Sequence, residues 1–183
     1  MRLTPLQKLI LVAGLQLFLL AALLGFKGYT VLTGETIVLA VAPVDPRDPF
    51  RGDYVTVRYD ISTIDSDEVA GDDYVEGTVY VELREGSDGY WDAVALHEKR
   101  ERSFDGTLLI KGHIESQNYG LGAGYSYEID YGIEEVFIPE GSGTTVAEVP
   151  RGHLGVEVKV DRYGNAVARH FVVDGAPLDL ERQ

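Results

Sequence analysis

The chain has 183 residues, of which 45% are hydrophobic, and this length suits one globular domain with a tether. It contains no cysteine, which excludes disulfides, thiolate metal sites and a cysteine nucleophile. The net charge of −14 argues against nucleic acid as a partner, because nucleic-acid binding depends largely on Lys and Arg contacts with phosphates.

The first predicted element is an apolar helix over residues 9–26 (LILVAGLQLFLLAALLGF), in which Gln16 is the one strongly polar residue. A helix needs about 17–25 such residues to cross the hydrocarbon core of a membrane. Residues 1–8 then form a short N-terminus, and residues 27–35 a short juxtamembrane linker. A cleaved signal peptide is the competing interpretation, but the apolar run exceeds the usual length of about 7–15 residues. We therefore predict an uncleaved transmembrane helix, a signal anchor.

The charges that flank the helix predict its orientation. Arg2 and Lys8 precede the apolar segment, and Lys27 follows it. Basic residues close to a span favour the cytoplasmic side. We therefore expect residues 1–8 in the cytoplasm and the following domain outside it, on the cytoplasmic membrane.

The rest of the chain, residues 36–183, shows the pattern of β-strands. In Tyr54–Ile61, the side chains of Val55, Val57 and Tyr59 fall on one face, which is the period-two signature of a half-buried strand. The other predicted strands cover residues 36–42, 75–83, 90–97, 108–114, 125–133, 154–161 and 166–173. The last two are joined by a turn at 162–165 (RYGN). This spacing predicts a mainly β, antiparallel domain, a sandwich or barrel-like fold.

The segment 43–62 (PVDPRDPFRGDYVTVRYDIS) is the most distinctive part of the chain. It contains three prolines, and five charged residues lie within nine positions: Asp45, Arg47, Asp48, Arg51 and Asp53. One interpretation is a loop braced by its own Arg–carboxylate pairs. The other is a rigid polar loop that contacts a cation, a peptide or a partner subunit.

Residues 52–59 (GDYVTVRY) resemble the motif that names the GDYXXLXY family of membrane-anchored prokaryotic proteins, with Val57 in place of the family's Leu. The segments 43–48 (PVDPRD), 131–134 (YGIE) and 137–141 (FIPEG) are similar to that family as well. The resemblance implies a single N-terminal span and an exported domain. Since some relatives occur beside or fused to multi-span membrane proteins, it also implies such a protein as a partner. It implies no particular activity.

These observations predict a membrane-anchored extracytoplasmic binding or assembly module, an accessory subunit of a membrane complex. Its expected interface comprises Asp45, Arg47, Asp48, Arg51, Gly52, Asp53, Tyr54, Val57 and Tyr59. The alternative is an extracytoplasmic enzyme or cation-binding protein that uses scattered carboxylates together with His97, His113, His153 and His170. Because no Ser lies in a G-x-S-x-G motif and the His residues lack zinc-motif spacing, we predict no catalytic or metal-binding residue and no cofactor.

Overall fold

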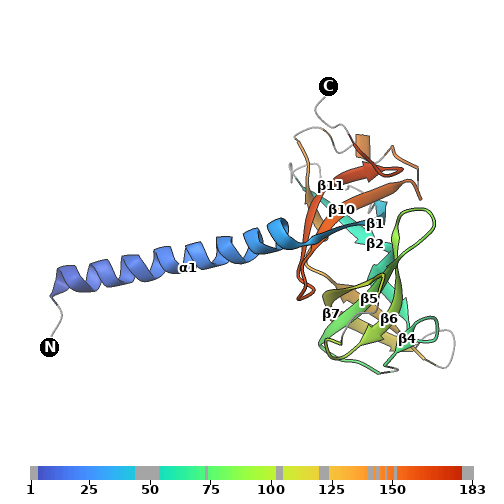
Figure 1. Ribbon diagram of the computed structural model, residues 1–183, viewed down its shortest axis with the longest axis horizontal. Helices are drawn as coiled ribbons and strands as arrows, with labels where there is room; N and C mark the ends of the chain where they lie inside the picture. The colour runs from blue at the N-terminus through green and yellow to red at the C-terminus, as the bar shows by residue number, and fades with distance from the viewer. Residues whose placement is uncertain are drawn as a thin grey trace.

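The computed structural model describes residues 4–43, 54–72, 74–101, 105–119, 124–139, 142, 145–146, 148–150 and 152–178. In these residues a long N-terminal helix leads into a β-domain and projects well away from it (Figure 1). The predicted architecture, an apolar N-terminal helix followed by a mainly β and mostly antiparallel domain, is confirmed.

Helix α1 (Pro5–Thr33) begins at a capping box, in which the side chains of Thr4 and Gln7 each accept a hydrogen bond from the other's backbone N–H. Its 29 residues rise about 44 Å, and the helix is long and apolar enough to cross a membrane. Residues 27–33, expected as part of a linker, continue the helix as far as Thr33. The helix ends at Gly34, whose N–H donates to the carbonyl of Thr30.

The last turn of α1 is packed against the β-domain. The Thr30 side chain is 1% exposed, and its Oγ1 donates a hydrogen bond of 2.8 Å to Oδ2 of Asp161. At Gly34 a side chain would not fit, since a Cβ would lie 2.5 Å from the carbonyl oxygen of Thr30 and 3.1 Å from the backbone of Val160. Lys159 Nζ donates to the carbonyl of Gly34. Helix and domain therefore meet in a tightly packed joint.

Asp161 organises the domain side of this joint. Its Oδ1 accepts hydrogen bonds from the backbone N–H groups of Tyr163 and Asn165, at 2.8 and 3.1 Å. Burial alone would raise the pKa of this carboxyl group, but the hydrogen bonds from Asn165, Thr30 and the backbone lower the pKa below its ordinary value. Asp161 is therefore held in its charged form where α1 meets the domain.

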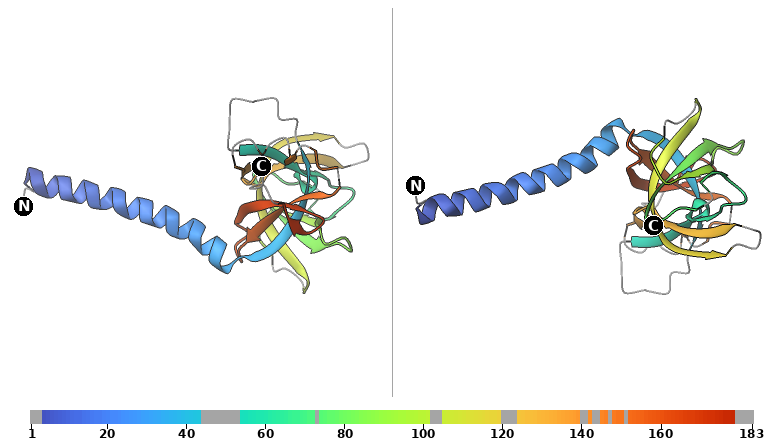
Figure 2. Two further views of the ribbon diagram at one scale, coloured as in Figure 1. Left: turned by 90° about the horizontal axis from the view of Figure 1, so that it is seen from above. Right: turned by 90° about the horizontal axis from the view of Figure 1, so that it is seen from below.

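The strands of the described residues form two six-stranded sheets, with the orders β12-β11-β10-β1-β2-β9 and β3-β8-β7-β5-β6-β4. Figure 2 shows the β-domain from two further sides, with the N-terminal helix projecting from it. A short 3-10 helix, η1 (Asp60–Ser62), follows β2. All pairs are antiparallel except β4 with β6. The strand bounds are β1 Glu35–Pro43, β2 Tyr54–Tyr59, β3 Thr63–Asp65, β4 Ala70–Gly71, β5 Thr78–Glu85, β6 Trp91–His97, β7 Thr107–Tyr119, β8 Tyr125–Asp130, β9 Glu135–Phe137, β10 Leu154–Val160, β11 Ala166–Val173 and β12 Ala176–Pro177.

One hydrophobic core joins the two sheets. The inward residues alternate along their strands, as expected for strands with one buried face. They include Leu39 on β1, Val81 on β5, Ile110 on β7 and Val158 on β10, none of which is measurably exposed. The predicted hairpin of β10 and β11 is present, and its turn uses Gly164 at a φ of +87°.

The predicted strand over 125–133 ends early, at Asp130. Gly132 adopts a φ of +69°, a conformation that turns the chain and that glycine adopts without strain. Tyr131 and Ile133 are still buried, so the alternation in sequence continued through a turn rather than through a strand. The turn leads into β9, a short strand that the sequence pattern did not predict.

Candidate functional site

Strand β2 carries the part of the predicted interface that the structure describes. Val57 and Tyr59 are 2% and 1% exposed, so they are core residues rather than surface contacts. The strand begins at Tyr54, whose backbone pairs with Phe137 of β9. Asp45, Arg47, Asp48, Arg51, Gly52 and Asp53 lie outside the described residues. The described part of the motif, Tyr54–Tyr59, therefore builds the fold.

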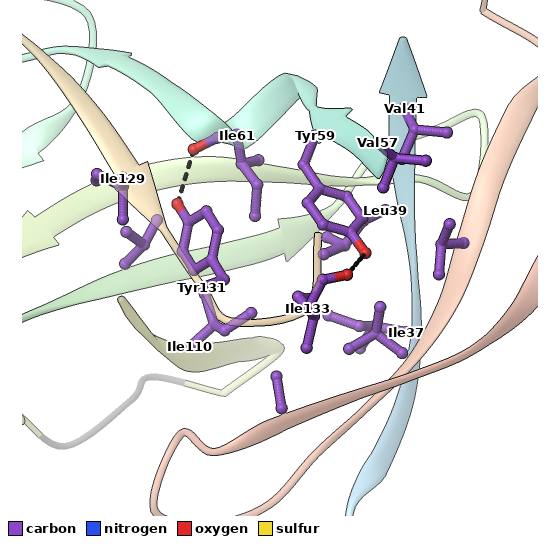
Figure 3. Close-up of a cluster of buried hydrophobic side chains, with 14 of the residues drawn as sticks. Ile37, Leu39, Val41, Val57, Tyr59, Ile61, Ile110, Ile129, Tyr131 and Ile133 are labelled. Carbon is purple, nitrogen blue, oxygen red and sulfur yellow. Dashed lines mark hydrogen bonds between the residues drawn. The ribbon is translucent and has the colours of Figure 1, made fainter. Parts of the chain in front are cut away.

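Two buried tyrosines tie β2 to the turn that follows β8. The Tyr59 hydroxyl donates to the carbonyl of Ile133, and the Tyr131 hydroxyl donates to the carbonyl of Ile61, both at 2.7 Å (Figure 3). The bonds are reciprocal, because residues 59–61 and residues 131–133 each supply one phenol and one carbonyl. Burial, with a smaller effect of Glu134, raises the pKa of both phenols, so both remain protonated donors.

Two carboxylates hold the turn over residues 130–134. Glu134 accepts hydrogen bonds from the backbone N–H groups of Tyr131 and Ile133, each at 2.7 Å, and Asp130 accepts one from Gly132. Burial, and next its interaction with Asp130, raise the pKa of Glu134. The backbone carbonyl of Glu134 also accepts a bond from Val57 N–H at 2.8 Å. The turn is thereby attached to the motif strand at several points.

Beside β2 lies an open cleft of about 650 Å³. Its walls come from β2, η1, β7, β8 and β9, and its charged lining residues are Arg58, Glu115, Glu128, Asp130, Glu134 and Glu135. Arg58 pairs with Glu128, and Ser116 donates to the other oxygen of Glu128 at 3.2 Å. Five carboxylates and one guanidinium give the cleft a negative charge, which suits a positively charged group of a partner.

Three of the four histidines considered for an assembled site lie near separate carboxylates. His97 lies 3.4 Å from Glu82, and His153 lies 2.7 Å from Asp174. His170 is 3.7 Å from Glu157. Within the described parts of the chain, no group of three or more His, Cys, Asp or Glu side chains is arranged to hold a metal ion. The cleft beside β2 is therefore the strongest candidate site that these residues form.

Sequence reasoning found the motif strand but not the cleft beside it. Glu115, Glu128 and Glu134 lie on different strands and turns, and each looks like an ordinary surface carboxylate in the sequence. The one usable signal was the segment YGIE at 131–134, which includes Tyr131 and Glu134. Its residues are the ones that join this turn to β2.

A family model described as GDYXXLXY protein matches residues 16–171 of the chain. The match begins inside α1 and ends inside β11, so it includes part of the helix, the joint and most of the β-domain. The chain matches no curated protein and no solved structure.

Proposed function

Because the chain belongs to the GDYXXLXY family, with a match that includes both helix and domain, we propose that it is a membrane-anchored binding or assembly module. Helix α1 is its single span, the β-domain lies outside the cytoplasm, and the protein serves as an accessory subunit of a complex in the cytoplasmic membrane. The observation that carries this proposal is the packed joint between an exposed apolar helix and the β-domain.

The exposure of α1 supports a role as anchor. Large apolar side chains point outward on every side of the helix, and Leu17, Phe18 and Leu24 are 68%, 68% and 76% exposed. Such a helix is stable in lipid, where its backbone groups are satisfied internally and its side chains leave water. The helix also runs without a break into the buried contact between Thr30 and Asp161. That continuity favours a retained anchor over a cleaved leader.

The absence of cysteine from the sequence allows a direct test of this topology. Ser87→Cys places one thiol in the exposed turn between β5 and β6, and Leu6→Cys places one near the helix N-terminus. In intact cells, a membrane-impermeant maleimide should label Ser87→Cys, and it should label Leu6→Cys only after the cells are opened. The reverse pattern, or labelling of both thiols in intact cells, would refute the proposed orientation.

The partner in this proposal lies in or next to the membrane, because the joint keeps the domain close to the end of the span. Thr33 lies seven positions after Phe26, which is about 10 Å of helix. We assign the contact to the segment 45–53, which the sequence predicts to be a polar loop, and to the acidic cleft that borders β2. A multi-span membrane protein that presents a basic segment fits this surface in both position and charge.

Co-purification of the full chain from detergent-solubilised membranes tests the assignment. Arg47→Ala, Asp48→Ala, Arg51→Ala and Asp53→Ala are compared one by one with Arg84→Ala, a control at an exposed position on β5. We expect a partner to be lost from at least one loop variant while its unfolding temperature stays unchanged. If every variant that loses the partner also has a lowered unfolding temperature, these residues act as a structural brace and the assignment is wrong.

A further inference from the structure

Two arginines and two tyrosines gather where α1 meets the domain. The guanidinium carbons of Arg162 and Arg100 lie 4.8 and 5.8 Å from the ring centroid of Tyr163, within cation–π range. The Tyr163 ring lies 6.3 Å from that of Tyr29 on α1. We call these four residues the juxtamembrane cluster. The turn between β10 and β11, which carries Arg162 and Tyr163, lies beside the end of α1 (Figure 1).

The two guanidinium groups are available to a ligand. Arg100 donates to the carbonyl of Arg162, and Arg162 donates to the Tyr163 hydroxyl at 2.6 Å. Among the described residues neither forms a salt bridge. A guanidinium carries five N–H donors, so each arginine keeps donors that these contacts do not use. Both side chains are exposed.

A recess of about 480 Å³ lies beside the cluster and contains charges of both signs. Arg100 and Arg162 line it together with Glu35, Glu101 and Asp161. Asp161 is engaged by Thr30 and Asn165, as described above. Within the described part of the chain, Glu35 and Glu101 form no salt bridge. The recess therefore offers two guanidinium groups and two carboxylates to one ligand.

The position of the cluster along α1 sets its depth in a membrane. Tyr29 is three residues beyond Phe26, about 4.5 Å past the end of the apolar segment. The headgroup layer on each side of the hydrocarbon core is about 5–7 Å thick. The Tyr163 ring centroid lies 6.3 Å from that of Tyr29, so Tyr163 and the two arginines beside its ring lie near this layer. Glu35 follows the end of the helix and lies further from the span.

We propose that this recess binds the headgroup of a phospholipid that carries both a phosphate and a primary ammonium group, as in phosphatidylethanolamine. Arg100 and Arg162 bind the phosphate, and Glu101 and Glu35 accept hydrogen bonds from the ammonium group. A purely anionic headgroup would leave the carboxylates unpaired, and a quaternary ammonium group has no N–H to donate. This inference rests on the proposed function, because it requires α1 to span the membrane.

Native mass spectrometry of the full chain in detergent, with one added lipid at a time, tests the proposal. Phosphatidylethanolamine should bind at least about five-fold more tightly than phosphatidylcholine, whose quaternary ammonium donates no hydrogen bond to the carboxylates, and than phosphatidylglycerol, which has no ammonium group. Arg100→Gln and Arg162→Gln should each weaken its binding by about five-fold. Arg84→Gln, on β5, serves as the matched control and should bind like the wild type. Glu101→Gln should reduce the preference over phosphatidylcholine while phosphate binding persists.

Equal binding of the three lipids, or an equal loss in Arg84→Gln, would overturn the proposal. The proposal would also be overturned if water-soluble glycerophosphoethanolamine bound as tightly as phosphatidylethanolamine, because the site would then be one for a free metabolite rather than a lipid. The fluorescence of Trp91, the only tryptophan, checks that each variant is folded. The cysteine-labelling experiment tests the proposed function separately. If labelling shows that α1 does not span the membrane, the proposed function is wrong. If the topology is correct but the protein shows no lipid preference, only this inference is rejected.

Discussion

Removing one phenolic hydroxyl at a time from Tyr59 and Tyr131 should destabilise the domain, and the hydrogen bonds in the structure allow the loss of free energy to be estimated. Tyr59→Phe and Tyr131→Phe keep the buried rings and delete one hydrogen bond each, to the carbonyls of Ile133 and Ile61. A lost buried bond that leaves its carbonyl without this donor costs about 1–2 kcal/mol. For a domain of this size, each kcal/mol lowers the unfolding temperature by about 2–4 °C.

The double variant should cost less than the sum of the two single variants. Both bonds join the same two segments, residues 59–61 and 131–133, so loss of the first loosens the geometry of the second. We expect a coupling free energy of about 0.5 kcal/mol or more, as is usual for residues that share a network.

The assay is thermal and guanidinium unfolding of the full chain in detergent, followed by the fluorescence of Trp91. This residue lies half-buried on β6, so its signal reports on the β-domain and not on α1. Tyr119→Phe is the matched control, because that side chain is 86% exposed, and it should change stability by less than about 0.5 kcal/mol. If Tyr59→Phe and Tyr131→Phe behave like this control, the two bonds do not stabilise the attachment of the motif strand.

Three further predictions concern the core, the joint and the span. Gly112→Ala should destabilise the domain by about 1–3 kcal/mol in the same unfolding assay, because the new Cβ would lie 2.4 Å from Cγ2 of Ile129. Asp161→Asn should be less stable than the wild type at pH 7. Because the pKa of Asp161 is lowered in the folded chain, its stabilisation is fully present above the unfolded pKa of about 3.9 and is lost as pH falls through the folded value. The difference between variant and wild type should therefore shrink when unfolding is measured from pH 5 downward, and a constant difference would contradict the role of the charge. Leu17→Arg places a charge near the centre of the span, where insertion costs about 2.5–3.5 kcal/mol, and should reduce the carbonate-resistant membrane fraction, whereas Leu17→Ile should not.

Local patterns in the sequence predicted much of the fold, because burial of one strand face produces a period of two. Val57 and Tyr59 were placed on the same face as Val55, and all three are in the core. The hairpin of β10 and β11 was predicted from alternation and from its turn at 162–165, where Gly164 has a positive φ. These features depend on residues that are close together in the chain.

The features that local patterns could not predict depend on distant pairings. Thr30 bonds to Asp161 across 131 positions, and nothing near Thr30 in the sequence distinguishes it from other small polar residues after the apolar segment. The attachment of β2 to residues 131–137 is equally non-local. Tyr131 and Ile133 continued the period of two, and Gly132 gave no sign of whether it lay in a strand or a turn. The cleft depends on all of these pairings.

The contacts of Thr30, Gly34 and Lys159 hold the end of α1 against the β-domain, so the two should move together. If α1 spans a bilayer as proposed, a tilt of the helix moves the far end of the domain by a distance proportional to its length, and a rotation of the helix turns the whole domain with it. One residue inserted between Phe26 and Tyr29, before the joint, would rotate the domain by about 100° around the helix axis relative to the apolar segment. In the proposed topology, a neighbouring membrane protein that pushes on α1 would thus move surfaces of the β-domain, without any change inside the domain itself.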